Sequence, residues 1–253
     1  MYLRCPAQYY FRYVENLKMP PGLALTFGKS IDSGLNLNYN QKKETFKDLK
    51  VDLMIDAYEQ TYDTEIKNTL LTEDDDPKKT REQGIKLIKE YHKNISPTVQ
   101  PLQVQEKIEV DFEDFDYKLL VVPDLITIEE NIIDNKTSSH SPPQENGIYR
   151  PSSFEHYLQL VADNFAFLSK YKKESENLRI DYLVKTKTPK VVTVNFKPQK
   201  EDNVFFLNIL GRIADAIKNN IFYPNRNCMT CSYKFCGYAK LCEAQFGGKV
   251  KEK

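Results

Sequence analysis

An abrupt change in residue pattern near position 100 restricts the possible folds more than any other feature of the sequence. Before it, apolar residues recur at helical spacing in segments 2–16, 23–37, 46–71 and 79–94. After it, β-branched and alternating segments are separated by short polar turns, as in strands, at 103–110, 117–128 and 131–136. A helix at 152–171, strands at 180–187 and 190–196, and a helix at 201–219 follow. This order predicts an α/β fold with a mixed β-sheet core flanked by helices.

The composition excludes several classes of protein. Hydrophobic residues make up 40% of the 253 residues and charged residues 28%, which is typical of a globular chain. Lys plus Arg and Asp plus Glu number 36 each, so the chain as a whole is not a polycation. The longest apolar runs, such as residues 119–122, are far shorter than the roughly 20 residues of a membrane span. With no signal-like start either, we expect a cytoplasmic protein without a membrane partner.

Two carboxylates and a lysine lie on neighbouring predicted strands. Asp124 follows Pro123 inside an apolar segment, and Asp134 and Lys136 belong to the next strand. If a turn at residues 129–131 makes these strands antiparallel, both carboxylates reach one edge of the sheet, and Lys136 shares the face of Asp134. A close carboxylate pair is stabilised by a cation, and oxygen ligands select Mg²⁺ or Mn²⁺. The alternative is an ordinary surface ion pair.

Such a group has the parts needed to hydrolyse a phosphodiester. A divalent cation polarises a phosphate oxygen and lowers the pKa of a bound water. The ammonium group of Lys136 can orient that water or neutralise the charge that develops on phosphorus.

Segments throughout the chain resemble the PD-(D/E)XK nuclease superfamily, in its RecB/AddB-like exonuclease branch, which includes the CRISPR adaptation nuclease. The matching segments, in chain order, are residues 2–13 with Cys5-Pro6, residues 27–32 with Gly28, Glu106, residues 121–124 and 132–137, and the helix at 154–167 with Gln159. The resemblance implies a restriction-endonuclease-like fold in a single domain over 1–253. Residues 42–95 would be a helical insertion within that domain.

The resemblance also implies an activity and a site. The chain would be a Mg²⁺- or Mn²⁺-dependent deoxyribonuclease, an exonuclease on single strands or DNA ends in recombination or repair, with DNA and a helicase or recombination protein as partners. The metal ligands would be Asp32, Asp124, Asp134 and the backbone carbonyl of Asn135. Lys136 would activate water, and Glu106 would be a further acidic group of the site. Gln159 would hydrogen-bond the lysine or DNA.

This sequence departs from the family pattern at three places. Asp32 stands where the family has a metal-binding histidine, and a third carboxylate strengthens metal binding while opposing the approach of phosphate. Asp163 stands where a tyrosine four residues after Gln159 is usual. The family also has several residues ahead of the position of Tyr2, so either a misplaced start or a truncated chain is expected. Asp32 leaves open a second function: a DNA-binding scaffold subunit with weak catalysis.

The cysteines predict a metal or cluster site. Cys228, Cys231, Cys236 and Cys242 lie in the segment 221–245, and Cys5 lies near the other end of the chain. A zinc site usually has two C-x2-C pairs, and only one is present. The resemblance implies a [4Fe–4S] cluster on Cys5, Cys231, Cys236 and Cys242, with Cys228 as the alternative to Cys231, that joins the two ends of the chain. Zinc remains the alternative metal, including in an interaction module unrelated to nucleases.

Three histidines have no role in these predictions. His92 is expected to be solvated near the end of an exposed helix, and His140 to lie in a loop after Lys136. His156 shares the helix of Gln159 and is expected to be buried in the core.

Overall fold

The computed structural model describes residues 1–112 and 117–252, which form two compact units. The core unit comprises residues 23–67 and 76–206, and the terminal unit comprises residues 1–22, 68–75 and 207–253 as far as they are described. A single nuclease domain over residues 1–253 stays a prediction beside this division.

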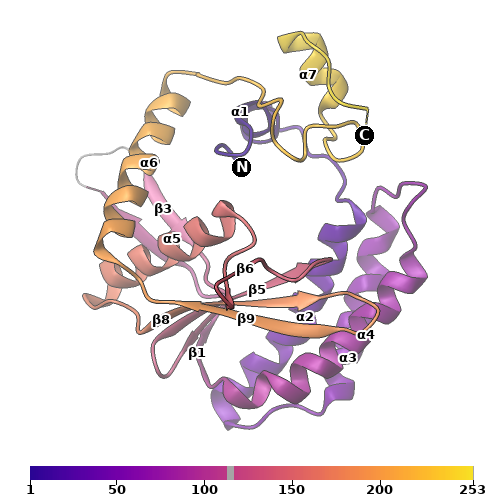
Figure 1. Ribbon diagram of the computed structural model, residues 1–253, viewed down its shortest axis with the longest axis vertical. Helices are drawn as coiled ribbons and strands as arrows, with labels where there is room; N and C mark the ends of the chain where they lie inside the picture. Colours follow the sequence, from indigo (N-terminus) through magenta and orange to yellow (C-terminus); the bar gives the residue numbers. More distant parts are fainter. Residues whose placement is uncertain (113–116, 253) are drawn as a thin grey trace. The chain divides into compact units, whose positions relative to one another are not determined.

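A five-stranded mixed sheet organises the core unit (Figure 1). Its strands stand in the order β1 (Pro101–Val104), β4 (Leu125–Thr127), β5 (Asn131–Ser138), β8 (Asn177–Val184) and β9 (Lys190–Phe196). Neighbouring strands are antiparallel except β5 and β8, which are parallel. The helix α5 (Phe154–Tyr171) lies between these two strands in the chain, because parallel neighbours need a long crossover connection. The predicted mixed sheet flanked by helices is therefore present.

Three helices cover one face of this sheet. They are α2 (Leu23–Thr45), α3 (Val51–Glu65) and α4 (Pro77–Asn94), with 3₁₀ turns η2 (Ile66–Asn68) and η3 (Ser96–Thr98) after α3 and α4 (Figure 1). Large buried side chains from all three helices, including Tyr39, Tyr58 and Tyr91, pack with Ile133 and Leu183 of the sheet. The helix α2 runs unbroken through residue 42, so the predicted start of the insertion falls inside a helix.

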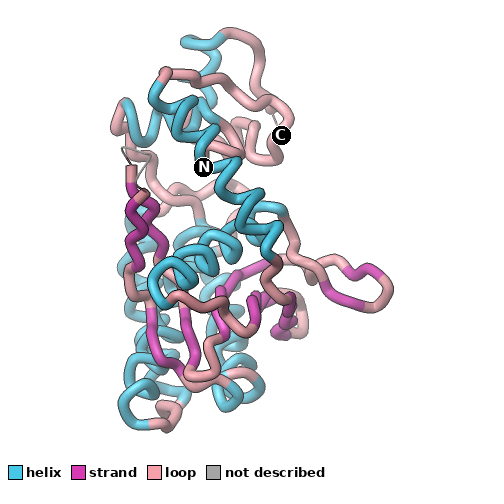
Figure 2. The backbone as a smooth tube through the Cα atoms, turned by 90° about the vertical axis from the view of Figure 1, so that its left-hand side faces the viewer, coloured by secondary structure: helices cyan, strands magenta, loops and turns pink. Residues whose placement is uncertain are grey.

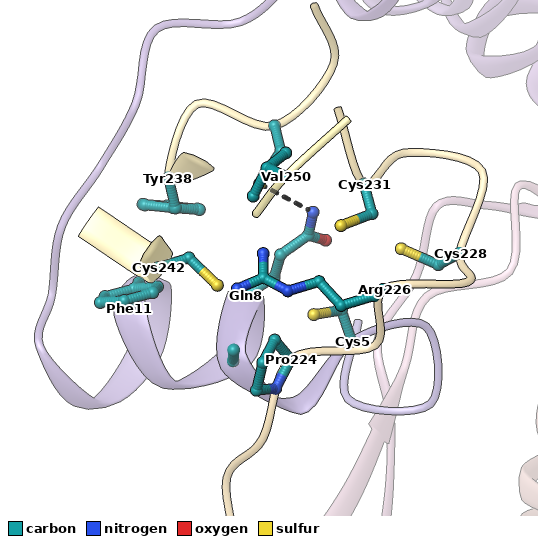
Figure 3. Close-up of a pocket in the computed structure, with 12 residues that line it drawn as sticks. Cys5, Gln8, Phe11, Pro224, Arg226, Cys228, Cys231, Tyr238, Cys242 and Val250 are labelled. Carbon is teal, nitrogen blue, oxygen red and sulfur yellow. Dashed lines mark hydrogen bonds between the residues drawn. The ribbon is translucent and has the colours of Figure 1, made fainter. Parts of the chain in front are cut away.

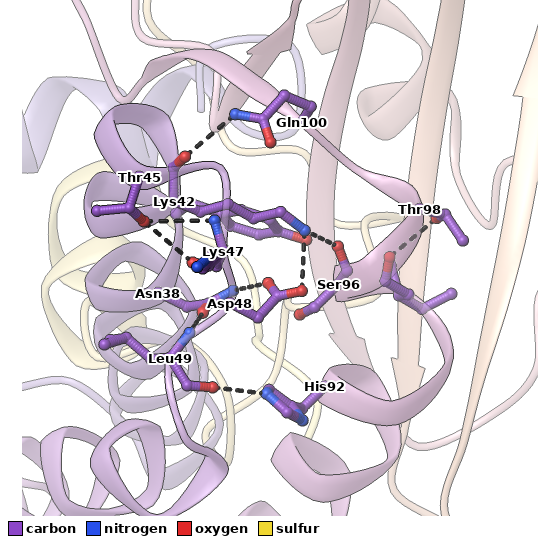
Figure 4. Close-up of polar contacts among 12 residues, drawn as sticks. Asn38, Lys42, Thr45, Lys47, Asp48, Leu49, His92, Ser96, Thr98 and Gln100 are labelled. Atoms are coloured by element: carbon purple, nitrogen blue, oxygen red, sulfur yellow. Dashed lines mark hydrogen bonds and ion pairs between the residues drawn. The ribbon is translucent and has the colours of Figure 1, made fainter.

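A buried polar network fixes the loop between α2 and α3 (Figure 4). The ammonium group of Lys42 lies 2.9 Å from Asp48 and donates a hydrogen bond to the Ser96 carbonyl at 2.7 Å. The ring Nε2 of His92 lies 2.8 Å from the Leu49 carbonyl oxygen. The expectation that His92 is solvated was therefore wrong, because the neighbouring loop folds back onto α4.

The opposite face of the sheet is covered by α5, which also packs on the two-stranded sheet of β2 (Ile108–Asp111) and β3 (Lys118–Val121). Buried side chains of α5, such as Leu160 and Phe167, pack with Ile180 and Val194 of the main sheet. A small hairpin of β6 (Gln144–Glu145) and β7 (Ile148–Tyr149) stands out from the core unit (Figure 2).

The terminal unit brings together both ends of the chain. It contains α1 (Pro6–Tyr9), a π-helical turn η1 (Tyr10–Val14), α7 (Ala239–Phe246) and the residues of α6 (Lys200–Lys218) from Leu207 onward. The rings of Phe11 and Tyr238 stack with centroids 5.4 Å apart, and the Tyr238 hydroxyl donates to the Leu17 carbonyl at 2.6 Å. None of the helices in the described chain is both long and apolar enough to span a membrane.

Two of the predicted strands are each broken in two. Residues 103–110 were predicted as one strand, but β1 and β2 belong to different sheets because Gln105 adopts a left-handed backbone conformation with φ of 48°. Residues 117–128 likewise divide into β3 and β4, and Pro123 between them has no N–H to donate to a neighbouring strand. Both breaks flank the candidate site.

Candidate active site and cysteine pocket

Asp124 sits where the pairing of β4 with β5 ends. The predicted antiparallel pairing is confirmed, and its last pair is Leu125 with Ile133. Beyond this pair, the Asp124 carboxylate takes the place of a strand neighbour and accepts a hydrogen bond from the Asn135 N–H at 2.8 Å. A side chain thus continues the ladder and brings one carboxylate beside the segment that carries Asp134.

Asp134 is the most buried member of the group, at 1% exposure. Its Oδ1 accepts hydrogen bonds from the Lys136 ammonium and the Gln159 amide, each at 2.8 Å, and its Oδ2 lies 2.7 Å from the same ammonium. Lys136 shares the face of Asp134 because side chains two residues apart in a strand point the same way. Gln159 comes from α5, which covers that face.

Asp32 reaches this group from α2. Burial raises its pKa to about 7, with further contributions from the nearby charges of Asp124 and Asp134 and partial compensation by Lys136. Burial likewise raises the pKa of Asp134 to about 7, with Lys136 opposing the rise and Asp124 adding to it. The pKa of Asp124 is raised by burial too, although the Asn135 N–H and Lys136 lower it.

Three carboxylates therefore face a single ammonium group, and the charges do not balance. The pKa of Lys136 is raised by the carboxylates of Asp134, Asp124 and Asp32, against the effect of burial. In residues 1–112 and 117–252, no three His, Cys, Asp or Glu side chains stand grouped so that they could hold a metal ion. The donor chemistry nevertheless fits a hard divalent cation, because oxygen ligands of excess negative charge are what Mg²⁺ and Mn²⁺ bind.

Glu106 is not brought to these carboxylates. It lies in the connection between β1 and β2, not at the start of a core strand as predicted, and its exposed carboxylate pairs with Lys43 at 3.4 Å. Instead, the side chain of the neighbouring residue Gln105 hydrogen-bonds Asp124 and lowers the pKa of that carboxyl. Nothing in the sequence distinguished Gln105, whose position depends on the left-handed turn.

Two further buried groups near the site were not assigned from sequence. The Tyr91 hydroxyl donates to the side-chain oxygen of Asn135 at 2.9 Å and accepts from the Tyr39 hydroxyl at 3.0 Å. Asp163, the departure from the usual tyrosine, is 3% exposed, and burial together with Asp134 and Asp124 raises its pKa well above the ordinary value. Side chains from both faces of the sheet thus converge on β5.

In the terminal unit, the five cysteines line one pocket with Gln8 and Arg226 (Figure 3). Cys5 comes from the start of α1, and the others come from the C-terminal segment. All five are free thiols, and the Gln8 amide donates to the Cys236 sulfur at 3.3 Å. The two chain ends therefore meet at a group of soft ligands.

The thiols are not equivalent. Burial raises the pKa of Cys242, with Arg226 opposing the rise and Cys5, Cys236 and Cys231 adding to it. The same causes, burial first and then Cys5 and Cys231, raise the pKa of Cys236, which Gln8 opposes. Cys228 is absent from both sets of interacting charges, and its sulfur lies 3.5 Å from the Thr230 hydroxyl. All five cysteines nevertheless line the same pocket, and Cys228 packs against the buried cluster that contains Cys231.

Comparison with known protein families identifies the family of this chain. The family model of the PD-(D/E)XK nuclease superfamily matches residues 1–243. The chain belongs to the PD-(D/E)XK nuclease superfamily. It is accordingly a nuclease that hydrolyses phosphodiester bonds, in a family whose members generally depend on divalent metals. No match was found among curated proteins.

Two solved structures are similar to this PD-(D/E)XK nuclease at low sequence identity. A protein from Eubacterium rectale described as a "putative exonuclease" is similar with a TM-score of 0.50 and 14% identity, over 79% of this chain and 76% of that one. The structure of SSO0001 has a TM-score of 0.40 and 14% identity, over 95% of both chains. The first supports the restriction-endonuclease-like fold seen in the mixed sheet and its flanking helices.

Proposed function

We propose that the chain is a Mg²⁺- or Mn²⁺-dependent deoxyribonuclease whose active site is the group of Asp32, Asp124, Asp134 and Lys136. The observation that supports this most is the contact of Lys136 with both oxygens of the buried Asp134 carboxylate, at 2.8 and 2.7 Å. A lysine and a carboxylate on adjacent inward positions of one strand, beside a second carboxylate at the strand edge, are the parts needed for phosphodiester hydrolysis.

Each side chain has a distinct task in this proposal. Asp124 and Asp134, helped by Asp32 and the Asn135 carbonyl, hold the cation, and Gln159 fixes the orientation of the Asp134 carboxylate. When bound, the cation supplies Lewis-acid polarisation of a phosphate oxygen. Lys136 orients the attacking water and neutralises the negative charge that develops on phosphorus. Glu106, predicted as a further acidic group, lies exposed beside Lys43 and has no task in this proposal.

The substrate proposal extends to single strands or DNA ends, processed in recombination or repair beside a helicase or recombination partner. It rests on the resemblance of the motifs to the RecB/AddB-like branch and on the family match over residues 1–243. The same family match supports DNA as the nucleic acid.

The decisive experiment is cleavage of labelled single-stranded and duplex DNA with Mg²⁺ and with Mn²⁺. We expect Lys136→Ala to lower kcat about 100-fold or more, because one preorganised electrostatic contact of this kind is worth about 10²–10³ in rate. Lys118→Ala is the matched control, since this exposed lysine pairs with Asp111 in the β2–β3 sheet, and it should cleave at the unaltered rate. Equal activity of the Lys136→Ala variant would rule out the assigned role.

The same assay tests the scaffold alternative through Asp32→His. A third carboxylate adds negative charge where a phosphate must approach, so the histidine is expected to change metal preference and leave an active enzyme active. If the unaltered protein does not cleave and Asp32→His does, the chain is a DNA-binding subunit that retains the fold without its catalysis.

We further propose that the cysteine pocket holds a [4Fe–4S] cluster through Cys5, Cys231, Cys236 and Cys242. Support comes from the donor set, since thiols from both chain ends line one pocket and soft thiolates favour such clusters. The Arg226 guanidinium at this pocket offsets the negative charge of the thiolates. Zinc on the same thiols is the outcome that metal analysis would separate from this one.

A further inference from the structure

The imidazole of His156 belongs to the candidate active site, although histidine at this helical position was expected to be part of the core. His156 is half-buried, and it lies three residues before Gln159 in α5. Residues three apart share one face of a helix, and Gln159 of this face reaches Asp134. His156 therefore faces the side of the sheet on which Asp134 and Lys136 stand.

Tyr182 ties this imidazole to the strand next to Lys136. Tyr182 of β8 is the register partner of Lys136 in the parallel pair of β5 and β8, so the two side chains point to the same face. Its hydroxyl lies 2.9 Å from Nδ1 of His156, and the two rings are 5.7 Å apart between centroids. The tyrosine is fully buried, so its hydroxyl is a fixed anchor for the histidine.

The hydrogen bonds at this hydroxyl are compatible with one protonated form of His156. The Ser152 N–H donates to the Tyr182 oxygen at 2.8 Å, and the hydrogen of the tyrosine hydroxyl is available for Nδ1 of His156. In the tautomer whose Nδ1 accepts this hydrogen, the proton of the neutral imidazole sits on Nε2. Burial and the nearby charge of Lys136 lower the pKa of His156 and so favour this neutral form.

Two other donors of this face contact the Asp134 carboxylate. Lys136 and Gln159 both donate to Asp134, whereas Nε2 of His156 has no hydrogen-bond partner among the described residues. A substrate strand carries a phosphate at every nucleotide, and the three carboxylates of the site repel these phosphates. A neutral donor beside Lys136 can bind one of these phosphates. Because it carries no charge, it does not compete with Lys136 or a metal ion for the carboxylates.

We propose that His156 is a substrate-binding residue whose Nε2–H donates a hydrogen bond to a non-bridging phosphate oxygen of the nucleic acid strand at the active site. Tyr182 acts as a positioning residue that holds the imidazole in the required tautomer and orientation. This inference rests on the proposed nuclease function and adds to it the group that recognises the backbone of the strand. The histidine makes no covalent bond and transfers no proton.

Two substitutions of His156 test the roles of its two ring nitrogens separately. In His156→Gln the amide nitrogen reaches the place of Nε2, so the donor to phosphate is kept. In His156→Asn the amide reaches only the place of Nδ1, so the contact with Tyr182 is kept and the donor is lost. A hydrogen bond to a charged group is worth about 1.5–3 kcal/mol, so we expect His156→Asn to weaken binding at least about tenfold. His156→Gln should bind within about threefold of the unaltered protein.

Binding is measured by fluorescence anisotropy of a labelled single-stranded oligonucleotide with Ca²⁺, and KM and kcat are measured with Mg²⁺. His140→Ala is the control, because this exposed histidine lies in the loop after β5. We expect the Asn variant to raise Kd and KM together with little change in kcat. Nitrogen NMR of histidine-labelled protein should show His156 protonated on Nε2, and Tyr182→Phe should abolish this preference.

The outcomes distinguish the inference from the proposed function. An unaltered protein that binds the oligonucleotide without cleaving it, while His156→Asn binds more weakly, supports the inference and contradicts the nuclease assignment. A nuclease whose affinity is the same in the Asn, Gln and unaltered forms overturns the inference alone. Equal loss of affinity and of thermal stability in both variants, or no binding by the unaltered protein, overturns it as well.

Discussion

At the scale of single residues, the candidate site holds more carboxylates than the ammonium group of Lys136 can neutralise. Asp32 and Asp134 are each held at a pKa of about 7, chiefly by burial, against an ordinary value near 4 for aspartate. This charge is unfavourable for folding and favourable for binding a divalent cation. Function and stability therefore oppose each other at these two side chains.

These shifts predict how stability depends on pH. Because both folded-state pKa values are raised, the folded protein binds more protons than the unfolded chain between about pH 4 and pH 7. In the presence of a chelator, the free energy of unfolding should fall as pH rises from 5.5 to 8, by about 1–3 kcal/mol. Mg²⁺ at 100 times its Kd should restore about 2.7 kcal/mol at pH 8.

Urea unfolding measured across this pH range with chelator and with Mg²⁺ checks the prediction. Asp32→Asn removes one of the two groups, so it should raise stability at pH 8 in chelator and flatten the pH dependence. A free energy of unfolding that rises between pH 5.5 and 8 in chelator would contradict the assignment of these two carboxylates.

At the scale of elements, the helices on one face of the sheet take part in shaping the site. The side-chain oxygen of Asn135 in β5 accepts from Tyr91 of α4, which in turn accepts from Tyr39 of α2. The N–H of the same Asn135 is the donor to Asp124. The predicted insertion at 42–95 therefore supplies a buried hydroxyl that positions the strand bearing Asp134 and Lys136.

Tyr91→Phe tests this role with little change in volume. The variant removes the hydrogen bonds of Tyr91 with the buried Tyr39 and the half-buried Asn135, so we expect a loss of about 1–3 kcal/mol in stability. Because the orientation of Asn135 is affected, kcat should also fall several-fold while KM changes little. Tyr62→Phe, whose hydroxyl donates to the Pro77 carbonyl at 2.8 Å, should lose stability without the loss in kcat. An unchanged kcat in Tyr91→Phe would show that Tyr91 only packs.

At the scale of the whole molecule, the chain divides into a core unit that carries the carboxylates and a terminal unit that carries the cysteines. The terminal unit is assembled from three separate segments of the chain. Among its described residues, the buried cluster around Phe11 and Tyr238 is much smaller than the clusters of the core unit. A cluster bound by cysteines from both chain ends would contribute folding free energy where the hydrophobic core is limited.

Cysteine substitutions test this contribution. We expect anaerobically purified protein to contain iron and sulfide, Cys231→Ser to lose most of both, and Cys228→Ser to retain them, because the proposal assigns Cys231 and not Cys228 as a ligand. In limited proteolysis, the first cuts in Cys231→Ser should fall in the terminal unit, since removal of its ligand loosens this unit. Zinc without iron in the unaltered protein, or iron loss only in Cys228→Ser, would contradict the proposal.

Much of the fold follows from local pattern. Periodicity predicted most of the helices and strands in their order, but not α7 or the hairpin of β6 and β7. Burial of one face repeats every 3.6 residues in helices and every two in strands. The same two-residue period placed Asp134 and Lys136 on one face, and the turn at 129–131 placed Asp124 beside them. These relations lie within about a dozen residues of chain, where spacing determines geometry.

What only the tertiary structure decided involves residues far apart in the chain. Helix packing on the sheet brings Asp32 of α2 and Gln159 of α5 to the site. It also decides that Gln105, and not Glu106, lies beside Asp124. The contact of Tyr91 with Asn135 depends on the same packing. The link between His156 and Tyr182 depends on it as well. Local spacing carries no information on these contacts, because packing of the apolar faces brings their partners together.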